Sequence, residues 1–462
     1  MRSLRCLIAG LLIVIVCLSA AACKGPSTSG TNGDSSGQQQ VTLKFTFWGS
    51  PVEKQAVENA IKKFEDKYKY IKVDALHIPT DYQAKITAML AGNEAPDVAY
   101  LSDTLCLEWA QEGKLVNVLE YMKNDPELKE EDHLESVWYR WAPDKALGTN
   151  TAVEAYALFY NKDMFEEAGA PLPPTKPEDA WSWDEFVEVA KMLTKDGSGK
   201  HPGEDGFDKN NIVQYGVQYG TGINSWMNAV YSNGGRFIKP DGSSTALTEP
   251  EAIEAIQKIA DLMNVHYVCP SPVAAKNIPE ISTALMTKKV AMVITGQWVL
   301  LDLAANKSLN FDIGVMPVLK EYKTVILGGA TAIFESSKHK DEAWLLYKWL
   351  NNPESSLELH AGGLWMPLLK NWYTDPELVS KWAENNPAHP ASYKDAVMRA
   401  TLEYGMSGPA YNVKNYGKIS AIVTPALDQV WLGEKTAEEA LKEVESQINE
   451  LVDGFYNSNR DY

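Results

Sequence analysis

Residues 41–101 alternate between strand-like and helix-like hydrophobic patterns, and this alternation constrains the fold more than any other feature of the sequence. Apolar and polar residues alternate through 41–48 (VTLKFTFW) and 71–78 (IKVDALHI), which is the period of a half-buried strand. Residues 57–68 and 82–91 place their apolar side chains on one helical face, and 97–101 (DVAYL) is a short buried strand after a proline. The order predicts an α/β fold with right-handed parallel crossovers.

Ligands of open parallel sheets bind beyond the carboxyl ends of the strands. The first predicted strand runs into Trp48–Ser50, and the third runs into Ser102–Asp103. These two strand ends are therefore the first places in the sequence where we expect binding side chains.

The remainder of the chain continues the mixture of strands and helices. We expect strands at 155–160 and 213–219 and helices at 250–264, 338–351 and 436–455, with a further helix capped by Ser182. Thr436 precedes two glutamates and should cap the last helix. The body from residue 41 onward is long enough for two globular lobes with cores of their own.

The N-terminus has the pattern of an export signal, which has to be set aside before the fold is considered. Arg2 and Arg5 precede an apolar run, residues 6–22, that ends in three alanines and then Cys23. A membrane-spanning anchor, an ordinary cleaved signal and a lipoprotein signal all remain open, but small residues before a cysteine favour the lipoprotein signal. We predict a signal peptide at 1–22, lipidation of Cys23 and a flexible tether at 23–40, which is polar and rich in Gly, Ser and Gln.

Composition limits the class of ligand. The formal net charge is −18, with 61 acidic and 43 basic residues. Phosphate binding needs clustered Lys and Arg, so the balance argues against nucleic acid and against an anionic ligand, and favours a neutral one. Outside the signal and Cys23 only Cys106 and Cys269 remain. They could form a disulfide, but two buried thiols fit better.

Several short motifs, read in order, resemble the family-1 extracellular solute-binding proteins of ABC importers. They are residues 92–98 (GNEAPDV), 153–155 (VEA), 160–163 (YNKD), 181–183 (WSW), 234–235 (GG), 296–298 (GQW), 328–329 (GG), 337–344 (SKHKDEAW) and 432–434 (LGE). Each motif alone is weak. Their order and spacing cover nearly the whole chain after the tether.

The resemblance implies a two-lobe, periplasmic-binding-protein-like fold of type II that closes on a ligand by hinge motion. The expected N-terminal lobe is 41–153 plus 318–352, and the C-terminal lobe is 154–317 plus 353–462. Crossovers are expected at 153–155, at Met316-Pro317 and near 351–353. The implied partners are a carbohydrate and the transmembrane permease subunits of an ABC importer, with a lipid anchor in the membrane, a monomeric state and no cofactor.

Three candidate ligand contacts come from the resemblance. Asp103 stands where family members place an acidic contact, although it could instead cap the helix that follows. Glu154 matches a glutamate that contacts ligand, although it could be a charge paired at the hinge. Trp298 matches a stacking tryptophan, although the strand before it could draw it into the core.

Five further candidates come from position. An aromatic face stacks on the apolar face of a sugar ring, and polar side chains bind its hydroxyls. Trp48 ends the first strand, and Tyr82 and Gln83 begin a helix. Trp226 and Trp365 lie in glycine-rich segments, where a tryptophan either faces a cleft or fills a core.

No established catalytic motif stands out. The sequence has no HExxH, GxSxG, P-loop or CxxC pattern, and its seven histidines lack the spacing of a metal site. We therefore predict a binding protein that is not an enzyme and holds no metal. The rival class is a secreted carbohydrate-active lipoprotein, a glycoside hydrolase or lyase, which would need two carboxyl groups about 5–10 Å apart in the cleft.

Overall fold

The computed structural model describes residues 39–102, 104–384 and 386–457. The predicted signal peptide, Cys23, Asp103 and nearly all of the predicted tether lie outside these residues. From Gln40 onward the chain forms one compact unit. In the part of the chain that the structure describes, none of the helices combines the length and the apolar character of a membrane span.

The strands belong to two main sheets and one hairpin. Their bounds are β1 Val41–Phe47, β2 Ile71–His77, β3 Val98–Leu101, β4 Trp138–Ala142, β5 Lys145–Thr149, β6 Glu154–Asn161, β7 Lys195–Asp196, β8 Ile212–Tyr219, β9 Val290–Gly296, β10 Phe311–Gly314, β11 Thr324–Leu327, β12 Ala330–Ile333 and β13 Gly405–Ser407.

The α-helices lie between and around these strands. Their bounds are α1 Pro51–Lys67, α2 Tyr82–Ala91, α3 Cys106–Gln111, α4 Val118–Met122, α5 Lys162–Ala168, α6 Trp183–Leu193, α7 Ile223–Ser232, α8 Pro250–Asn264, α9 Pro272–Ala275, α10 Ile281–Met286, α11 Leu300–Ala305, α12 Lys340–Asn351, α13 Leu357–Ala361, α14 Asn371–Thr374, α15 Pro376–Trp382, α16 Ala400–Tyr404, α17 Tyr416–Trp431 and α18 Ala437–Leu451.

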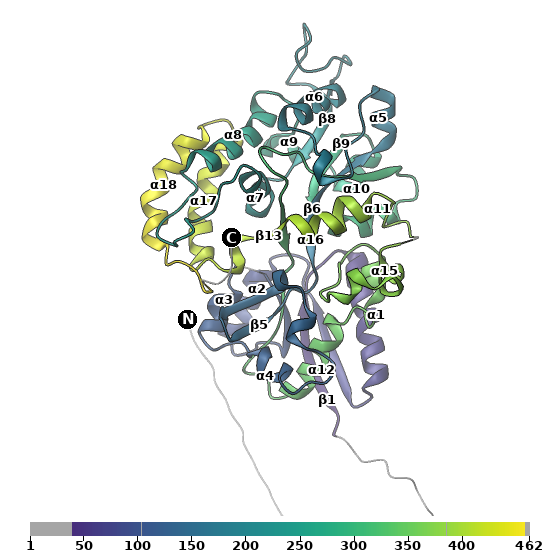
Figure 1. The fold of residues 1–462 in the computed structure, drawn as a ribbon, viewed down its shortest axis with the longest axis vertical. Coiled ribbons are helices and arrows are strands. Elements are labelled where there is room, and N and C mark those ends of the chain that lie inside the picture. The colour runs from purple at the N-terminus through teal and green to yellow at the C-terminus, as the bar shows by residue number, and fades with distance from the viewer. Residues whose placement is uncertain (1–38, 103, 385, 458–462) are drawn as a thin grey trace, which may run out of the picture. The chain divides into compact units, whose positions relative to one another are not determined.

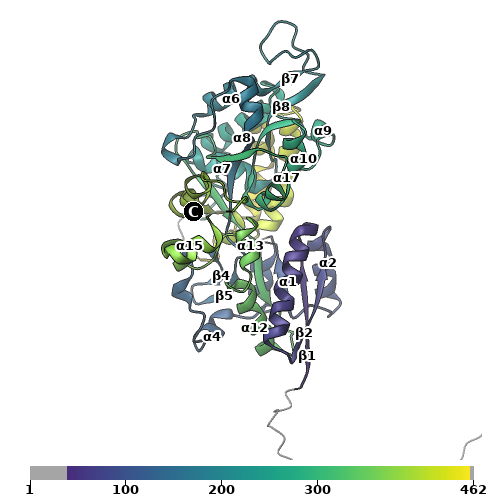
Figure 2. The ribbon, with the colours of Figure 1, turned by 90° about the vertical axis from the view of Figure 1, so that its right-hand side faces the viewer.

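The smaller lobe is built on a four-stranded sheet in the order β12-β3-β1-β2 (lower part of Figure 1). β1 pairs in parallel with β2 on one side and β3 on the other, and β12 joins the edge antiparallel. Phe45 and Tyr100 contribute to a core that includes residues of α1 and α12, which lie beside β1 and β2 in Figure 2. Ala99 and Leu101 belong to a separate core that includes α3. The sheet is thus covered on both faces, as an α/β fold requires.

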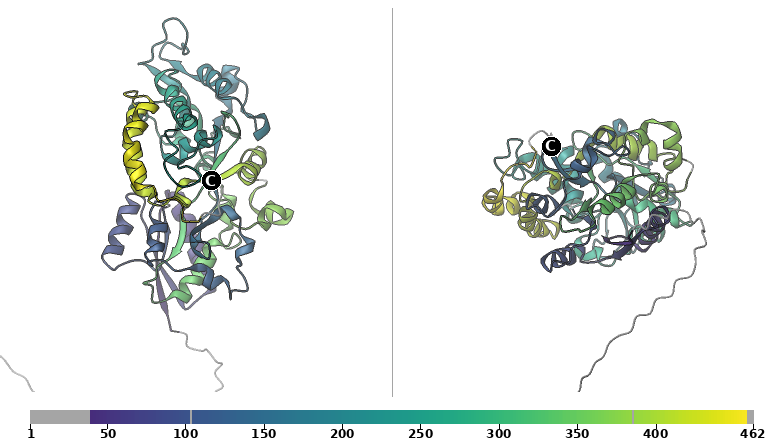
Figure 3. Two further views of the ribbon diagram at one scale, coloured as in Figure 1. Left: turned by 60° about the vertical axis from the view of Figure 1, so that its left-hand side comes forward. Right: turned by 90° about the horizontal axis from the view of Figure 1, so that it is seen from below.

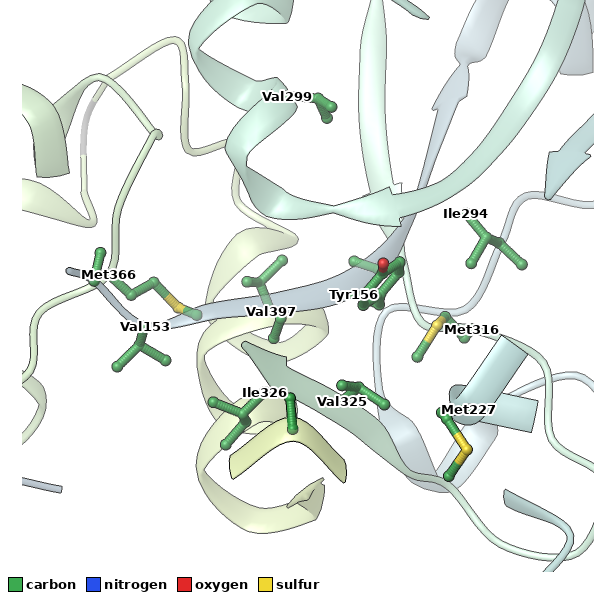
Figure 4. Close-up of a cluster of buried hydrophobic side chains, with 14 of the residues drawn as sticks. Val153, Tyr156, Met227, Ile294, Val299, Met316, Val325, Ile326, Met366 and Val397 are labelled. Atoms are coloured by element: carbon green, nitrogen blue, oxygen red, sulfur yellow. The ribbon is translucent and has the colours of Figure 1, made fainter. Parts of the chain in front are cut away.

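The larger lobe is built on a seven-stranded sheet in the order β13-β11-β6-β9-β8-β7, with β10 paired to β6 (upper part of Figure 1). β6 is central, and every one of its residues after Glu154 is buried. Figure 4 shows Tyr156 of β6 among apolar side chains of neighbouring elements, including Ile294 and Val325. In Figure 3 the yellow helices α17 and α18 lie beside the teal part of this lobe, where both pack on α8.

Two chain segments that pass between the sheets are hydrogen bonded to each other. The backbone N–H and the hydroxyl of Thr151 both donate to the carbonyl of Gly329, at 2.5 and 2.7 Å. The Asn150 side chain donates to the carbonyl of Leu327 at 3.1 Å. These bonds join the segment before β6 to the segment between β11 and β12, so the two crossovers lie together.

The expected second crossover at Met316-Pro317 is wrong. Residues Thr324–Leu327 still belong to the larger sheet as β11, where Ile326 and Leu327 pair with the first residues of β6. The chain therefore passes to the smaller sheet only at Gly328-Gly329, and the expected lobe boundary at residue 318 falls too early. The first crossover agrees with the prediction, because β6 of the larger sheet begins at Glu154.

Local signals in the sequence located most helix ends. The 250–264 helix has the predicted bounds, and Ser182 and Thr436 each form a complete capping box. Several bounds differ from prediction by one or two residues, and two differ by more. The last helix ends at Leu451 instead of continuing to residue 455, and the first begins at Pro51, before the apolar periodicity becomes visible at Val57. Cys106 and Cys269 are both buried and are not joined by a disulfide, which agrees with the buried-thiol interpretation.

Candidate functional site

A cavity of about 550 Å³ is lined by residues of both lobes. This volume lies within the range of about 300–1,000 Å³ usual for small-molecule sites. The smaller lobe contributes Trp48, Ser50, Glu53, Tyr82, Gln83 and Ser102, and the larger lobe contributes Glu154, Asn224, Trp298, Leu301, Asp302 and Leu364. The crossover residues Leu327, Gly328 and Gly329 complete the lining.

The topology of the smaller sheet explains why the cavity lies here. β1 is flanked by β2 and β3, so the chain leaves β1 in one direction and returns on its other side. Neighbouring carboxyl ends diverge at such a point and leave a crevice. Trp48 follows β1 and Ser102 follows β3, and both line the cavity. Both strand ends singled out from the sequence thus contribute residues to the cavity lining.

The aromatic side chains of the smaller lobe support one another. Trp48 meets the rings of Tyr82 and Tyr100 edge to face, with centroids 5.0 and 5.5 Å apart. The hydroxyl of Tyr82 donates to the carbonyl of Tyr100 at 2.7 Å and lies 3.0 Å from the hydroxyl of Thr46. Since that hydroxyl is already engaged, the ring of Tyr82 is the part that it offers to a ligand.

Trp298 comes from the opposite wall. It sits in the turn after β9, half-buried, with its ring edge to face against Tyr156 at 5.8 Å. The preceding Gln297 is fully buried and donates to the carbonyl of Leu364 at 2.8 Å, which fixes the backbone on both sides of this wall. Gln297 thus holds the turn in place. Trp298, the next residue of the same turn, lines the cavity.

Two glycines make room for the tryptophans. A Cβ at Gly296 would lie 1.6 Å from the nearest ring carbon of Trp298, and one at Gly329 would lie 2.2 Å from the ring of Trp48. Real Cβ atoms do not approach this closely, so any other residue would displace the ring. Each glycine is needed for the close approach of a cavity side chain.

Three carboxyl groups line the cavity: Glu53 of α1, Glu154 of β6 and Asp302 of α11. Burial raises the pKa of Glu53 to about 7, opposed by a backbone hydrogen bond at Ser50 and reinforced by the nearby charge of Asp302. A Cβ at Gly49 would lie 2.1 Å from the Glu53 carboxylate, so this glycine also makes room for a cavity side chain.

The other two acids are perturbed in the same direction. Burial raises the pKa of Glu154 to about 8, and the charge of Glu53 adds to this shift. Asp302 is exposed as a whole residue, but partial desolvation of its carboxyl group together with the charge of Glu280 raises its pKa. Burial and mutual repulsion both favour the protonated forms. We therefore expect these carboxyl groups to lose protons when a ligand supplies hydrogen-bond donors or positive charge.

Five of the residues chosen from the sequence line this one cavity: Trp48, Tyr82, Gln83, Glu154 and Trp298. They come from four separate parts of the chain, which the fold brings together. Gln83 is held in place because its side-chain oxygen accepts a hydrogen bond from Ser102. Asp103, the next residue, lies outside the described residues.

Trp226 and Trp365 are not in the cavity lining. Trp226 is 1% exposed on α7, and Trp365 is 2% exposed against His360 and Tyr100. Neither offers an aromatic face, so we assign both to the core, although they were proposed as ligand contacts from the sequence. A glycine-rich segment indicates backbone freedom, and it does not say which way its tryptophan points.

The sequence reasoning missed Glu53, Asp302 and Asn224. A signal for Glu53 was present, because Ser50-Pro51 followed by Glu53 is the pattern of a helix start. Ser50 does cap α1 through the N–H of Glu53, while the Glu53 side chain lines the cavity. Asp302 and Asn224 carry no comparable local signal. Among the described residues there is no group of three His, Cys, Asp or Glu side chains that could hold a metal ion.

Known proteins resemble this chain in sequence and in fold. The sn-glycerol-3-phosphate-binding periplasmic protein UgpB of Escherichia coli K12 is 24% identical over 319 residues, 66% of each chain. An ABC substrate-binding protein of Listeria monocytogenes in complex with cycloalternan superimposes with a TM-score of 0.77 at 22% identity, covering 89% of this chain and 99% of that one. A solute-binding protein of Thermotoga lettingae bound with α-D-tagatose gives 0.73 at 23% identity, covering 89% and 100%.

The family model for bacterial extracellular solute-binding proteins matches residues 48–356. This span starts at the tryptophan that ends β1 and includes both crossovers, most of each sheet and all of the cavity lining except Leu364. The chain belongs to the bacterial extracellular solute-binding proteins.

Proposed function

We propose that this protein captures a carbohydrate in the cavity between its lobes and delivers it to the permease subunits of an ABC importer. The observation that carries the proposal is the pairing of aromatic faces from opposite lobes, Trp48 with Tyr82 on one side and Trp298 on the other, around acidic and amide side chains. Aromatic faces suit the apolar faces of a sugar ring, and the polar groups suit its hydroxyls. The solved relatives with bound sugars support the same ligand class.

Ligand capture stabilises a closed arrangement because the cavity residues come from both lobes. A ligand that contacts Trp48 and Trp298 together binds more tightly when the lobes approach, so it shifts the population toward closure. The paired crossovers at Thr151 and Gly329 are the natural hinge. We expect the radius of gyration in small-angle scattering to fall on ligand saturation.

The membrane attachment that we propose rests on the N-terminal sequence. Cleavage before Cys23 and lipidation of that cysteine would leave the folded lobes on a polar tether outside the membrane, as a monomer facing the extracellular side or the periplasm. The Cys23→Ser variant should then be released into the medium or periplasm. Retention of that variant in membranes after an alkaline wash would contradict the lipid anchor.

The ligand class is tested by thermal shift with a panel of mono- and oligosaccharides, followed by calorimetry on the hits. A ligand at about a hundred times its Kd stabilises the folded protein by about 2.7 kcal/mol. sn-Glycerol-3-phosphate is the informative negative control, since it is the ligand in the name of UgpB and carries the charge that acidic walls repel. Binding of that phosphate with no response to any carbohydrate would overturn the proposal.

One observation also meets a requirement of the rival class, a secreted glycoside hydrolase. Glu53 and Glu154 line the same cavity, and burial raises the pKa of both. A hydrolase needs such a carboxyl group as its general acid. We propose that the protein binds its ligand without cleaving it, so oligosaccharides that stabilise it should be recovered intact. Release of new reducing ends, abolished in Glu154→Gln, would identify the enzyme instead.

A further inference from the structure

Every charged side chain that lines the cavity in the described part of the chain is acidic. Glu53 comes from the smaller lobe, and Glu154 and Asp302 come from the larger lobe. A fourth acid, Glu280, is close enough for its charge to act on Asp302. The described lining contains no Lys, Arg or His side chain that could balance these acids.

Glu53 is the most telling of these groups. Its residue is 8% exposed, and its carboxylate accepts a hydrogen bond from the backbone of Ser50. Among the described residues, no Lys, Arg or His side chain forms an ion pair with it within 4 Å. It lies in the first turn of α1, where the helix dipole favours a negative charge. Burial outweighs that contribution, since the pKa is nevertheless raised. A buried carboxylate that lines a cavity and has no basic partner among the described residues points to a cation supplied by the ligand.

A neutral sugar can meet only part of this need. Its hydroxyls can donate to one carboxylate each, but they leave in place the repulsion between Glu53 and Asp302 and between Glu53 and Glu154. One positive charge held among the three acids removes the repulsion and forms charge-assisted hydrogen bonds. The faces of Trp48 and Trp298 also attract a cation, which they do in addition to stacking on a ring.

We propose that the natural ligand is a basic carbohydrate, one that carries a protonated amine held among Glu53, Glu154 and Asp302. The inference rests on the proposed carbohydrate function and narrows its ligand class. The sugar ring lies against the tryptophans, and the ammonium group lies on the acidic side of the cavity. Selection operates by charge: phosphorylated and carboxylated sugars are rejected, and neutral sugars bind more weakly than their amino counterparts.

Calorimetry on matched sugar pairs tests the charge. The pairs are glucosamine with glucose, and the fully deacetylated chitosan disaccharide with cellobiose, each with the N-acetylated sugar as a third member. The amine-bearing member should bind about tenfold more tightly or better, with an advantage that shrinks as salt rises. Binding should also release protons, seen as a dependence of the heat on the ionisation enthalpy of the buffer.

Two variants and a control locate the effect. Glu53→Gln keeps the size of the side chain and should reduce the advantage of the amine about tenfold. Asp302→Asn should do the same, and because Asp302 is exposed we expect this variant to fold normally. Glu58→Gln is the control, since Glu58 lies on the same helix but pairs with Lys54 outside the cavity. It should leave every affinity unchanged.

The outcomes separate this inference from the function on which it rests. If neutral sugars bind as tightly as their amino counterparts, or if Glu53→Gln and Asp302→Asn both keep the preference, the charge assignment is wrong and carbohydrate binding stands. If neither the neutral nor the basic sugars bind, the carbohydrate function itself is wrong. A preference that is lost in both cavity variants and kept in Glu58→Gln supports the assignment.

Discussion

Two acids of the smaller lobe expose little of their carboxyl groups and behave in opposite ways. The side chain of Asp125 is 7% exposed, although the residue as a whole is only partly buried, and Glu53 as a whole residue is 8% exposed. Burial would raise the pKa of Asp125, but hydrogen bonds from Lys348 and from the Trp344 indole, both 2.8 Å, more than offset it, so the pKa is lowered. Glu53 has a backbone hydrogen bond at Ser50 but no basic partner among the described residues, and burial raises its pKa to about 7.

The difference teaches which groups serve the fold and which serve the ligand. Asp125 has its requirements met inside the protein, where it joins the segment after α4 to α12. The Glu53 carboxylate, although hydrogen bonded at Ser50, has no counter-charge until a ligand brings one into the cavity. The tryptophans divide in the same way: Trp226 is enclosed by core, whereas Trp298 has protein on one side and the cavity on the other.

The largest expected effect separates those two tryptophans. Trp226→Ala should lower the free energy of unfolding by about 3–5 kcal/mol, because it leaves a cavity in a packed core. Trp298→Ala should cost far less stability without ligand and about 1–3 kcal/mol of binding free energy, as aromatic contacts at binding sites do. Denaturant unfolding and calorimetry measure the two quantities.

Trp298→Phe is the matched control for stacking. A flat ring should recover most of the affinity that alanine loses, since the π face is what meets the sugar. If Trp298→Ala instead unfolds as readily as Trp226→Ala while its folded fraction keeps full affinity, Trp298 belongs to the core and the division between the tryptophans fails.

The second prediction concerns the pH dependence of stability in variants of the two acids. The dependence should have opposite signs for Glu53 and for Asp125. The folded-state pKa of Glu53 lies above its usual value of 4.5, so its contribution to stability is complete below pH 4.5 and is lost as the pH rises through about 7. Glu53→Gln should therefore raise stability at pH 9, relative to its effect at pH 4, by about 1–3 kcal/mol. The groups that face Glu53, namely Asp302, Glu154 and Tyr100, are all acidic, so none reverses this sign.

Asp125→Asn should show the reverse pH dependence. The folded-state pKa of Asp125 lies below its usual value of 3.8, so its contribution is present above that value and is lost on acidification. The variant should be destabilised by about 1–3 kcal/mol at pH 7 and by less at pH 3. If the stability of the two variants instead changed with pH in the same direction, Glu53 would have a basic partner inside the protein.

The sequence predicted those features that depend on nearby residues. Strand alternation located β1, β2 and β3, and from their order the site at Trp48 and Ser102 followed. Capping residues located the starts of α6 and α18. These signals are read within a few residues of chain, so no tertiary contact had to be known.

The features that were missed depend on distant contacts. The burial of Trp226 and Trp365 is decided by what packs over them, and β11 belongs to the larger sheet only because of its pairing with β6. The residues around Glu53 have the pattern of a helix start, but the apolar periodicity of α1 begins only at Val57. The first turn of α1, which contains Glu53, was therefore not predicted. Whether a buried carboxylate has a basic partner can be learned only from its surroundings in three dimensions.

The smallest expected effect tests the glycine under Trp298. Gly296→Ala keeps a backbone conformation that alanine readily adopts, with φ −73° and ψ 152°, so any effect arises from the added methyl group. That group would overlap the Trp298 ring and push it into the cavity. We expect affinity to fall about tenfold while the free energy of unfolding changes by about 1 kcal/mol, since the ring can move into open space.

Gly92→Ala is the control, because its Cβ would meet only ordinary contacts at 3.4 and 3.6 Å, outside the cavity lining. Calorimetry beside unfolding curves decides the matter. Full affinity in Gly296→Ala would mean that the position of the Trp298 ring does not limit binding. The cavity wall would then need only to be filled by a side chain of the right size, as the core does.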